Sequence, residues 1–474
     1  MQKHYRWRQC LPLLAIASTC LVGATVESPV SVPEDKGAEY AGGDTTVFET
    51  GRNAFSLPAA NLNEAQRTDF AIGNSFFKRN WVEAPSSTSA RDGLGPHFIA
   101  RSCGACHTED GRGAPPDFKN GLQAEQPVAL LFRLSIPGVG EHGSPKPEPR
   151  YGGQFNNDAI SGVKPEGRVE IRYREVGGKF DDGEPYSLRQ PEYRLTHLAY
   201  GKLHPQTMVS PRVAPQMIGL GLLDAIRPED IEANAKRQAE AGGAIHGRPN
   251  WVWDAYAQKA VIGRFGWKAN SGSIAHQSAA AFNGDIGITS SRFPAEECMP
   301  VQRDCQKAPR GGKPEIDDDK LDKLIFYSRT QAVPARRNLA DPRVKAGEAV
   351  FHAAQCAVCH TPKYTTGVLE GLPQVSNQTI RPYTDLLLHD MGPGLGDGRP
   401  DFLAKGNEWK TPPLWGLGLV PVVNGHSHYL HDGRARNLME AVLWHGGEAE
   451  PSKRQVLKLS KQDRANLIFF LESL

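Results

Sequence analysis

The chain lacks a marked excess of either charge, and it lacks long apolar runs beyond its first residues. Its 55 lysines and arginines nearly balance its 53 aspartates and glutamates, which leaves a net charge of +2. That balance gives no case for a nucleic-acid partner or an anionic membrane surface. After the N-terminal segment, no stretch is long and apolar enough to cross a membrane. The absences therefore argue against nucleic-acid-binding and membrane-spanning proteins.

Cysteine is also scarce, with eight in 474 residues. Cys10 and Cys20 lie in the N-terminal segment, four others lie in two copies of one motif, and Cys298 and Cys305 remain. In an oxidising compartment this last pair could close a small loop as a disulfide. A pair of free thiols is the alternative. We expect the bridge.

The length of the chain gives room for two or three domains and a sizeable core. It contains 49 glycines and 36 prolines. So many turn-forming residues predict a fold with long loops that surround its interior, in place of a regular helix bundle or sheet.

Residues 1–24 have the pattern of a secretory signal peptide. A basic start precedes an apolar run from 11 to 24 that is too short to span a bilayer comfortably, with small residues near its end. Cleavage is expected after Val22-Gly23-Ala24. We therefore expect the mature protein to lie in the periplasm.

A lipid anchor at Cys20 is the less favoured alternative, because Thr19 is an unusual residue before a lipidated cysteine. Residues 25–48 are expected to form a flexible linker ahead of the folded part.

Two copies of Cys-x-x-Cys-His carry the clearest chemistry in the chain: Cys103, Cys106 and His107, and then Cys356, Cys359 and His360. The composition gives about 0.004 chance matches to this pattern. A redox dithiol has no use for the following histidine. Four thiolates could bind zinc. Covalent haem attachment needs this local order, because two thiols add across the vinyl groups and the next residue places imidazole under the iron. The motifs therefore predict two c-type haems.

The surroundings of the two motifs repeat as well. Gly73 stands four residues before Phe77, and Gly347 stands four before Phe351, each in a short amphipathic helix that leads toward a motif. A mainly α fold follows, with two cytochrome c-like haem domains. The expected N-terminal haem domain spans 49–310, with a β-hairpin-rich insertion at about 128–205, and the C-terminal haem domain spans 311–474.

Within the insertion, apolar residues alternate at Val169, Ile171 and Tyr173 between glycine and aspartate turn clusters, which predicts strands and hairpins. Two other patterns have simpler explanations than binding sites. The acidic run at 315–319 opens a helix with an apolar face and is not a calcium site. The glycines of 392–401 form a loop and not a phosphate cradle, since no strand precedes them and no helix follows.

A longer set of motifs resembles the bacterial di-haem oxidoreductase family of peroxidase-like proteins, some of which are labelled thiol oxidoreductases. The motifs are RDGLGPHFIARSCGACHTEDGRG, YGGQFNNDAISGVKPEG, GRFGWKAN, PYTDLLLHDMGPGLGD, EWKTPPLWGLG and YLHDGRARNLMEAVLWHGGEA. The likeness covers nearly all of residues 50–474. More distantly the chain is similar to bacterial di-haem cytochrome c peroxidases and to the di-haem enzyme that matures methylamine dehydrogenase. No cysteine is left over for thiol oxidation.

The resemblance implies roles for residues that the sequence alone leaves ordinary. Within residues 263–290, a tryptophan would usually belong to the hydrophobic core, and a glutamine would usually cap a helix or face solvent. In the relatives a tryptophan lies between the haems, and a glutamine and an acid line the peroxide pocket of the N-terminal haem. Trp267 and Gln277 match, and Asp285 stands for the acid, although the relatives have glutamate about two residues later. Gln154 and Glu166 lie in a family motif without a matched role.

The resemblance also implies a ligand for the far side of the C-terminal haem. In the relatives a helix after the Tyr-x-His-x-Gly motif, here 429–433, ends at this ligand, which is usually methionine. In this chain the position is His445, and Met391 is the alternative. A bis-histidine haem should have a lower reduction potential than a His–Met haem, because thioether sulfur favours ferrous iron.

We therefore expect an open N-terminal haem on His107 that reacts with hydrogen peroxide, and a C-terminal haem on His360 and His445 that exchanges electrons with it through Trp267. A small redox protein such as a cytochrome c is the expected electron donor or acceptor. The distant relatives also imply calcium between the haem domains, with the backbone near Thr411-Pro412 as a ligand.

Two alternatives stay open. The first is an electron-transfer cytochrome in which His142, Met208 or Met217 closes the N-terminal iron. The second is a redox accessory of periplasmic iron handling.

Overall fold

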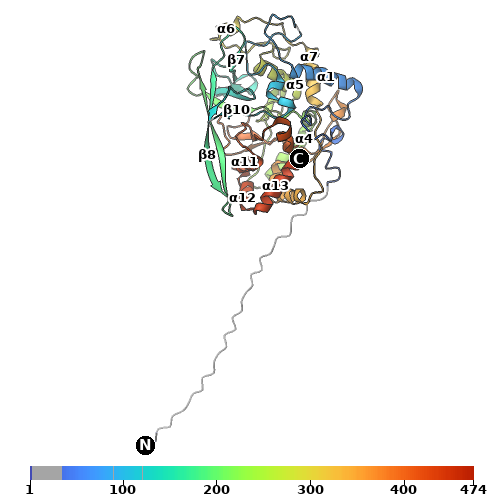
Figure 1. The fold of residues 1–474 in the computed structure, drawn as a ribbon, viewed down its shortest axis with the longest axis vertical. Coiled ribbons are helices and arrows are strands. Elements are labelled where there is room, and N and C mark those ends of the chain that lie inside the picture. Colours follow the sequence, from blue (N-terminus) through green and yellow to red (C-terminus); the bar gives the residue numbers. More distant parts are fainter. Residues whose placement is uncertain (3–34, 89, 120) are drawn as a thin grey trace.

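The computed structural model describes residues 1–2, 35–88, 90–119 and 121–474. The expected signal peptide and residues 25–34 of the expected linker lie outside this range, apart from Met1 and Gln2. In the ribbon view, α1 (Glu64–Lys78) and α7 (Asp318–Arg329) lie toward one end of the body, and α12 (Glu450–Lys458) and α13 (Lys461–Ser473) lie toward the other (Figure 1). No helix in the described ranges combines the length and the apolar character that a membrane span needs.

The helices are short and spread along the whole chain. They are α1 (Glu64–Lys78), α2 (Cys103–Cys106), α3 (Leu220–Asp224), α4 (Pro228–Ala241), α5 (Ile274–Ala281), α6 (Arg303–Gln306), α7 (Asp318–Arg329), α8 (Pro342–Ala353), α9 (Cys356–Cys359), α10 (Val420–Asn424), α11 (Leu438–Leu443), α12 (Glu450–Lys458) and α13 (Lys461–Ser473). A π-helical turn, η4 (Phe282–Ile286), continues α5.

Strands form several small sheets between the helices. They are β1 (His97–Phe98), β2 (Phe118–Lys119), β3 (Leu122–Gln123), β4 (Leu130–Val139), β5 (Pro145–Lys146), β6 (Gln154–Phe155), β7 (Asp158–Ala159), β8 (Arg168–Lys179), β9 (Pro185–Thr196), β10 (Met208–Val213), β11 (Trp251–Asp254), β12 (Lys259–Ile262), β13 (Tyr364–Thr365), β14 (Thr379–Ile380), β15 (Leu388–Asp390) and β16 (Glu408–Lys410). The largest sheet has the order β10-β4-β5, with β6 also paired to β4, and every pairing is antiparallel.

The expectation of a mainly α protein is wrong. Of the residues that the structure describes, 30% are in helices and 19% in strands, which makes this a mixed α/β fold. Strands extend beyond the insertion at 128–205, because β10 pairs with β4, β11 with β12, and β15 with β16. Most of these strands have two to six residues, too few to show the alternation of apolar residues by which a strand is recognised in a sequence.

A similar helix pair packs beside each of the two motifs. Beside the first motif α1 packs on α7, where the rings of Phe70 and Tyr327 lie 4.6 Å apart. Beside the second motif α8 packs on α13, where the ring of Phe351 lies 5.0 Å from that of Phe470. Both pairs surround a Cys-x-x-Cys-His turn, so the expected repeat has a structural counterpart. The division at residue 310 stays a prediction.

The repeated glycines allow these helices to touch. A Cβ on Gly73 would lie 2.1 Å from the carbonyl oxygen of Lys323 in α7. A Cβ on Gly347 would lie 2.0 Å from the carbonyl oxygen of Asn466 in α13. Both distances are far inside van der Waals contact, so any larger residue would force the helices apart.

The long hairpin β8–β9 belongs to the first half of the chain but packs against the second. It pairs Arg168 with Thr196 through to Lys179 with Pro185, as the alternating residues predict, and follows one edge of the body toward α12 (Figure 1). Phe180 and Leu188 at its tip cluster with Leu443 of α11.

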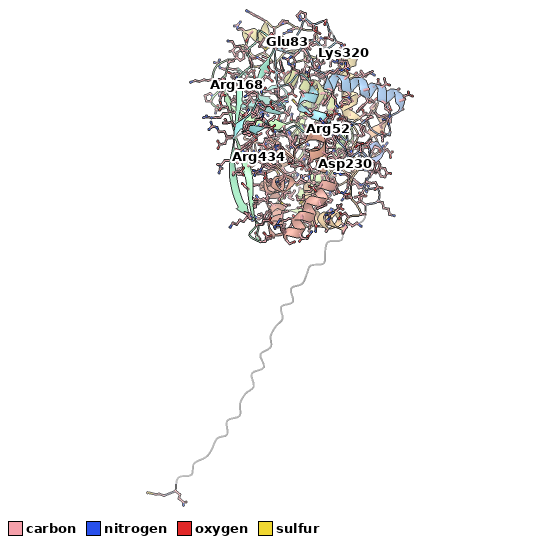
Figure 2. All side chains as sticks on the ribbon, viewed as in Figure 1. Arg52, Glu83, Arg168, Asp230, Lys320 and Arg434 are labelled. Atoms are coloured by element: carbon pink, nitrogen blue, oxygen red, sulfur yellow. A yellow bond between two sulfur atoms is a disulfide. The ribbon has the colours of Figure 1, made fainter. Side chains whose placement is uncertain are left out.

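Farther from its tip, the hairpin holds the segment ahead of α11. Tyr193 donates a hydrogen bond to Asp432 (2.9 Å), and Arg189 donates to the carbonyl of Gly433 (3.0 Å). Arg434, labelled in Figure 2, binds Asp432 on this side of the body (2.9 Å). The hairpin thereby fixes the chain that leads to His445.

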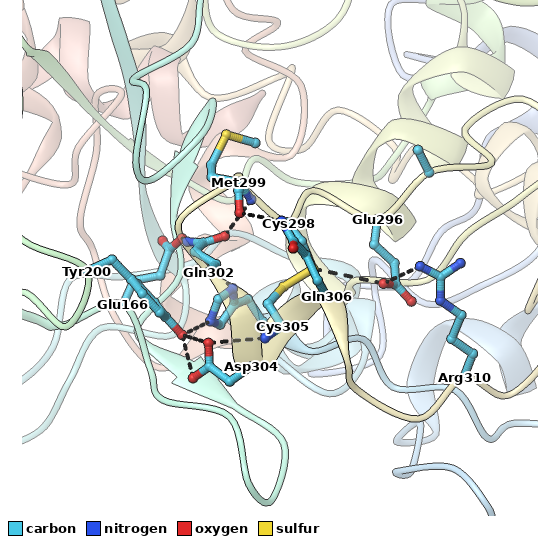
Figure 3. The surroundings of a disulfide bond; sticks show 12 residues. Glu166, Tyr200, Glu296, Cys298, Met299, Gln302, Asp304, Cys305, Gln306 and Arg310 are labelled. Atoms are coloured by element: carbon cyan, nitrogen blue, oxygen red, sulfur yellow. Dashed lines mark hydrogen bonds and ion pairs between the residues drawn. A yellow bond between two sulfur atoms is a disulfide. The ribbon is translucent and has the colours of Figure 1, made fainter.

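A disulfide joins Cys298 and Cys305, which confirms the predicted bridge (Figure 3). Inside this loop Gln302 donates a hydrogen bond to Glu166 (2.6 Å). The acidic run at 315–319 opens α7, where the Asp317 side chain accepts a hydrogen bond from the Lys320 amide, which confirms the predicted helix start. Residues 392–401 form a loop as predicted, but the expectation that no strand precedes them is wrong, because β15 ends at Asp390.

Candidate functional site

The first Cys-x-x-Cys-His motif lines a large cavity. Cys103 and Cys106 stand at the two ends of the single turn α2, and His107 follows. The Nδ1 atom of His107 lies 2.7 Å from the carbonyl oxygen of Pro215. That contact fixes the tautomer with hydrogen on Nδ1 and leaves Nε2 free as a ligand.

The thiols of this turn do not form a disulfide. Burial raises the pKa of Cys103 to about 12 and raises that of Cys106 as well, and the charge of Asp285 adds to both shifts. A redox dithiol needs a readily formed thiolate, so this environment opposes a redox dithiol. Neutral thiols beside a large cavity suit covalent attachment of a cofactor.

A second wall of the cavity carries Gln277 and Asp285, on α5 and the π-helical turn that continues it. The turn ends at Gly287, whose φ of 75° favours glycine. A π turn shifts the following side chains relative to a regular helix, and such turns are frequent at functional sites. Here it places an aspartate at the cavity wall.

Two residues from paired strands hold the Asp285 carboxylate. Gln154 of β6 donates a hydrogen bond to Oδ1 (3.0 Å), and Arg133 of β4 lies 3.8 Å from the same oxygen. Arg133 and Gln154 are directly opposite each other in the sheet. Oδ2 accepts no hydrogen bond from the part of the chain that the structure describes, so one carboxylate oxygen remains available for proton transfer.

The second motif lines a second cavity. Cys356 and Cys359 bound the turn α9, and His360 Nδ1 lies 3.0 Å from the carbonyl oxygen of Tyr383. His445 lines the same cavity just beyond α11, and its Nδ1 lies 2.8 Å from the carbonyl oxygen of Ala441. Both histidines thus have Nε2 free.

His445 also affects the pKa of His360. Burial lowers the pKa of His360 to about 4, and the nearby charge of His445 lowers it further in the same direction. Two neutral imidazoles in one cavity, each fixed through Nδ1, are a suitable pair of axial ligands.

Only some of the alternative ligands line the cavities. Met391 lines the second cavity, so it stays an alternative to His445. For the first cavity, Met217 lines the wall, two residues after Pro215. His142 instead stacks on Trp253 at 3.9 Å, and Met208 is paired in β10 away from the cavity lining.

Trp267 belongs to the wall that the two cavities share. Its indole Nε1–H donates a hydrogen bond to the carbonyl of Val213 (2.8 Å), which fixes the ring. The side chain is 8% exposed, and it contacts both cavities.

The family model that matches residues 36–474 is described as "Di-haem oxidoreductase, putative peroxidase". The chain belongs to this family. No curated protein and no solved structure matches it.

The cavities of this di-haem oxidoreductase suit the two haems that its family implies. They enclose about 1580 and 1430 Å³ of empty space, part of it open to solvent. Each has a thiol pair and a histidine with free Nε2 at one edge and mostly apolar walls elsewhere. Cys103, Cys106 and His107 would hold the first haem, and Cys356, Cys359, His360 and His445 the second.

A cluster of Cys359, Asp385 and His389 has metal-ligand spacing but is already satisfied. His389 Nδ1 lies 2.7 Å from Glu448, and its Nε2 lies 2.8 Å from Asp385. Although burial opposes the charged form, the two carboxylates raise the pKa of His389 well above its usual value. An imidazolium has no lone pair for a metal.

The sequence left Gln154 and Glu166 without roles, and the structure separates them. Gln154 contacts Asp285, whereas Glu166 accepts hydrogen bonds from the Asn156 amide (2.7 Å) and from Gln302, outside the cavity lining. Arg133 and Lys410, which line the cavities, were missed because no local pattern marks them. Calcium near Thr411 stays a prediction.

Proposed function

We propose that this protein is a periplasmic di-haem c-type cytochrome that reduces peroxide. The observation that carries the proposal is an asymmetry between the cavities. His360 and His445 both line the second cavity, whereas His107 is the one histidine among the described residues that lines the first. Two haems in these cavities would differ in coordination, one closed by two imidazoles and one with a free position.

With its iron bound by His107 alone, the first haem would supply a free coordination position at which peroxide binds and receives electrons. Asp285 would take a proton from hydrogen peroxide at its free Oδ2 and return it to the departing oxygen. Gln154 holds the other carboxylate oxygen, which leaves Oδ2 free for this proton. Gln277 lines the same wall and offers an amide that can hydrogen-bond peroxide.

Reduction of one peroxide to two waters consumes two electrons and two protons, so a donor is required. A second haem held by His360 and His445 would store and transfer electrons and would leave no position for a substrate. A small redox protein is the proposed donor. Trp267, fixed in the shared wall, is the proposed path between the cavities.

Replacement of Trp267 by phenylalanine is expected to slow electron transfer between the haems by up to about tenfold, because the ring loses a hydrogen bond worth about 0.5–1.5 kcal/mol and with it a fixed position. Stopped-flow spectra after peroxide is mixed with half-reduced protein would measure this rate. The matched control is Trp251→Phe, on an indole that is 42% exposed and outside both cavity linings. Equal rates in both variants would remove Trp267 from the path.

The second candidate is a pure electron-transfer cytochrome, and Met217 in the lining of the first cavity is the observation that favours it. The two functions differ in peroxide consumption by the fully loaded protein. With a reduced small cytochrome as donor, the peroxidase should oxidise two donors for each peroxide consumed. An electron-transfer protein would exchange electrons with the donor and leave peroxide untouched.

A further inference from the structure

The wall between the two cavities carries two cations that have no carboxylate within ion-pair distance among the described residues. Six residues line both cavities: Arg112, Gln216, Trp267, Lys410, Pro412 and Pro413. Two of them are cations, and none is an acid. Both cations lie on the boundary that any electron between the haems must cross.

Lys410 is 7% exposed, and its Nζ has neither a hydrogen-bond acceptor nor an ion-pair partner in the ranges that the structure covers. Its position in the chain is fixed, because it pairs with Leu388 at the end of β16 and its amide donates to the carbonyl of Trp267 (2.8 Å). The side chain therefore reaches the cavities from a rigid strand. Burial lowers the pKa of Lys410 to about 8.

Arg112 is 7% exposed, and its guanidinium lies 5.1 Å from the centre of the Trp267 ring. It donates hydrogen bonds to the carbonyls of His428 (2.8 Å) and Leu430. No carboxylate pairs with it within the described chain. Burial lowers the pKa of Arg112 to about 10.

Most other buried cations in the described chain have carboxylate partners, and Arg264, which binds only backbone carbonyls, is an exception. Lys268 pairs with Asp397 at 2.9 Å, and Arg212 pairs with Asp401 at 2.8 Å. An unpaired buried charge is strongly destabilising, and proteins pair such charges or place them against a charged ligand. We therefore expect anions from outside the chain to bind Lys410 and Arg112.

We propose that Lys410 and Arg112 form a carboxylate-binding pair between the cavities that takes propionate groups of the haems. This inference rests on the proposed two-haem function and adds a role for the wall. A haem carries two propionates, and a cavity wall with an ammonium and a guanidinium provides charge-assisted donors for them. Because a nearby cation favours ferrous iron, the pair also raises the reduction potential of the haem that it contacts.

Lys410→Met should lower the midpoint potential of one haem, because its propionate loses the cation. We expect about a tenfold change in the reduction equilibrium, or about 59 mV for a one-electron couple. Lys410→Arg keeps the charge and should retain most of the potential. The matched control is Lys405→Met, five residues earlier and exposed, which should change neither haem.

A spectroelectrochemical titration of both haems in each holoprotein measures these potentials. Unchanged potentials in Lys410→Met, with both haems attached, would overturn the proposal. If that variant fails to fold, Arg112→Gln serves as the second probe, with the same expected fall and the same contradicting result. The peroxidase proposal is tested separately, because a protein with no open iron could still show the shift.

Discussion

Replacement of Asp285 by asparagine should slow peroxide reduction by on the order of 100- to 10,000-fold, the usual contribution of general acid–base catalysis. Asparagine keeps the size of the side chain and can still contact Gln154, but it cannot accept a proton at the free oxygen. Binding of both haems should be unaffected, since Asp285 supplies no attachment group. The measurement is the rate of donor oxidation at saturating peroxide, with haem content determined for each preparation.

The matched control is Asp319→Asn. Asp319 is exposed in the first turn of α7 and far in sequence from either motif. It should react at the native rate. If Asp285→Asn reacts as fast as this control, Asp285 carries no proton in the reaction, and the role of Gln154 in orienting it is lost as well.

Replacement of His445 by methionine should raise the reduction potential of the second haem by on the order of 100 mV, because thioether sulfur stabilises ferrous iron more than imidazole does. The oxidised variant should also gain the charge-transfer band of Met–iron bonding. This band is absent from the expected spectrum of the native protein. Redox titration followed by visible spectroscopy measures both changes.

His246→Met is the control, because His246 is exposed and outside both cavity linings. Its potentials should equal those of the native protein. A Met–iron band already present in the native protein would instead favour Met391 as the ligand, and the bis-histidine assignment would fail.

The haem-attachment residues could be predicted from the sequence because their chemistry is local. Cys103, Cys106 and His107 need one helical turn to act together, and the turn is encoded by their spacing. The cysteine pair 298 and 305 is nearly as local, and its disulfide is confirmed. Gly73 and Gly347 were equally informative, since each marks a helix crossing next to a motif.

The strands could not be predicted in the same way. β1 pairs with β7 across some sixty residues, β6 adds two residues to β4, and β15 meets β16 across a long loop. Pairings between distant short segments leave no period of two in either one. The mainly α expectation failed for this reason, although the hairpin β8–β9, with twelve residues in each strand, was visible.

The residues that position the site could not be recognised in the sequence for a related reason. Gln154 reaches Asp285 across 131 positions of sequence, and Arg133 reaches it from the neighbouring strand. Lys410 lies in the family motif EWKTPPLWGLG, which assigned it no role. Such residues acquire roles from the fold, so the sequence could name the candidates for ligation and proton transfer but not the residues that position them.

The proposed function depends on one open iron and one closed iron in the same protein. EPR and visible spectra of the ferric holoprotein, before and after one equivalent of hydrogen peroxide, test this directly. We predict one high-spin and one low-spin haem, and a rapid spectral change of the high-spin component on addition of peroxide. A wholly low-spin protein whose spectrum peroxide leaves unchanged would contradict the account.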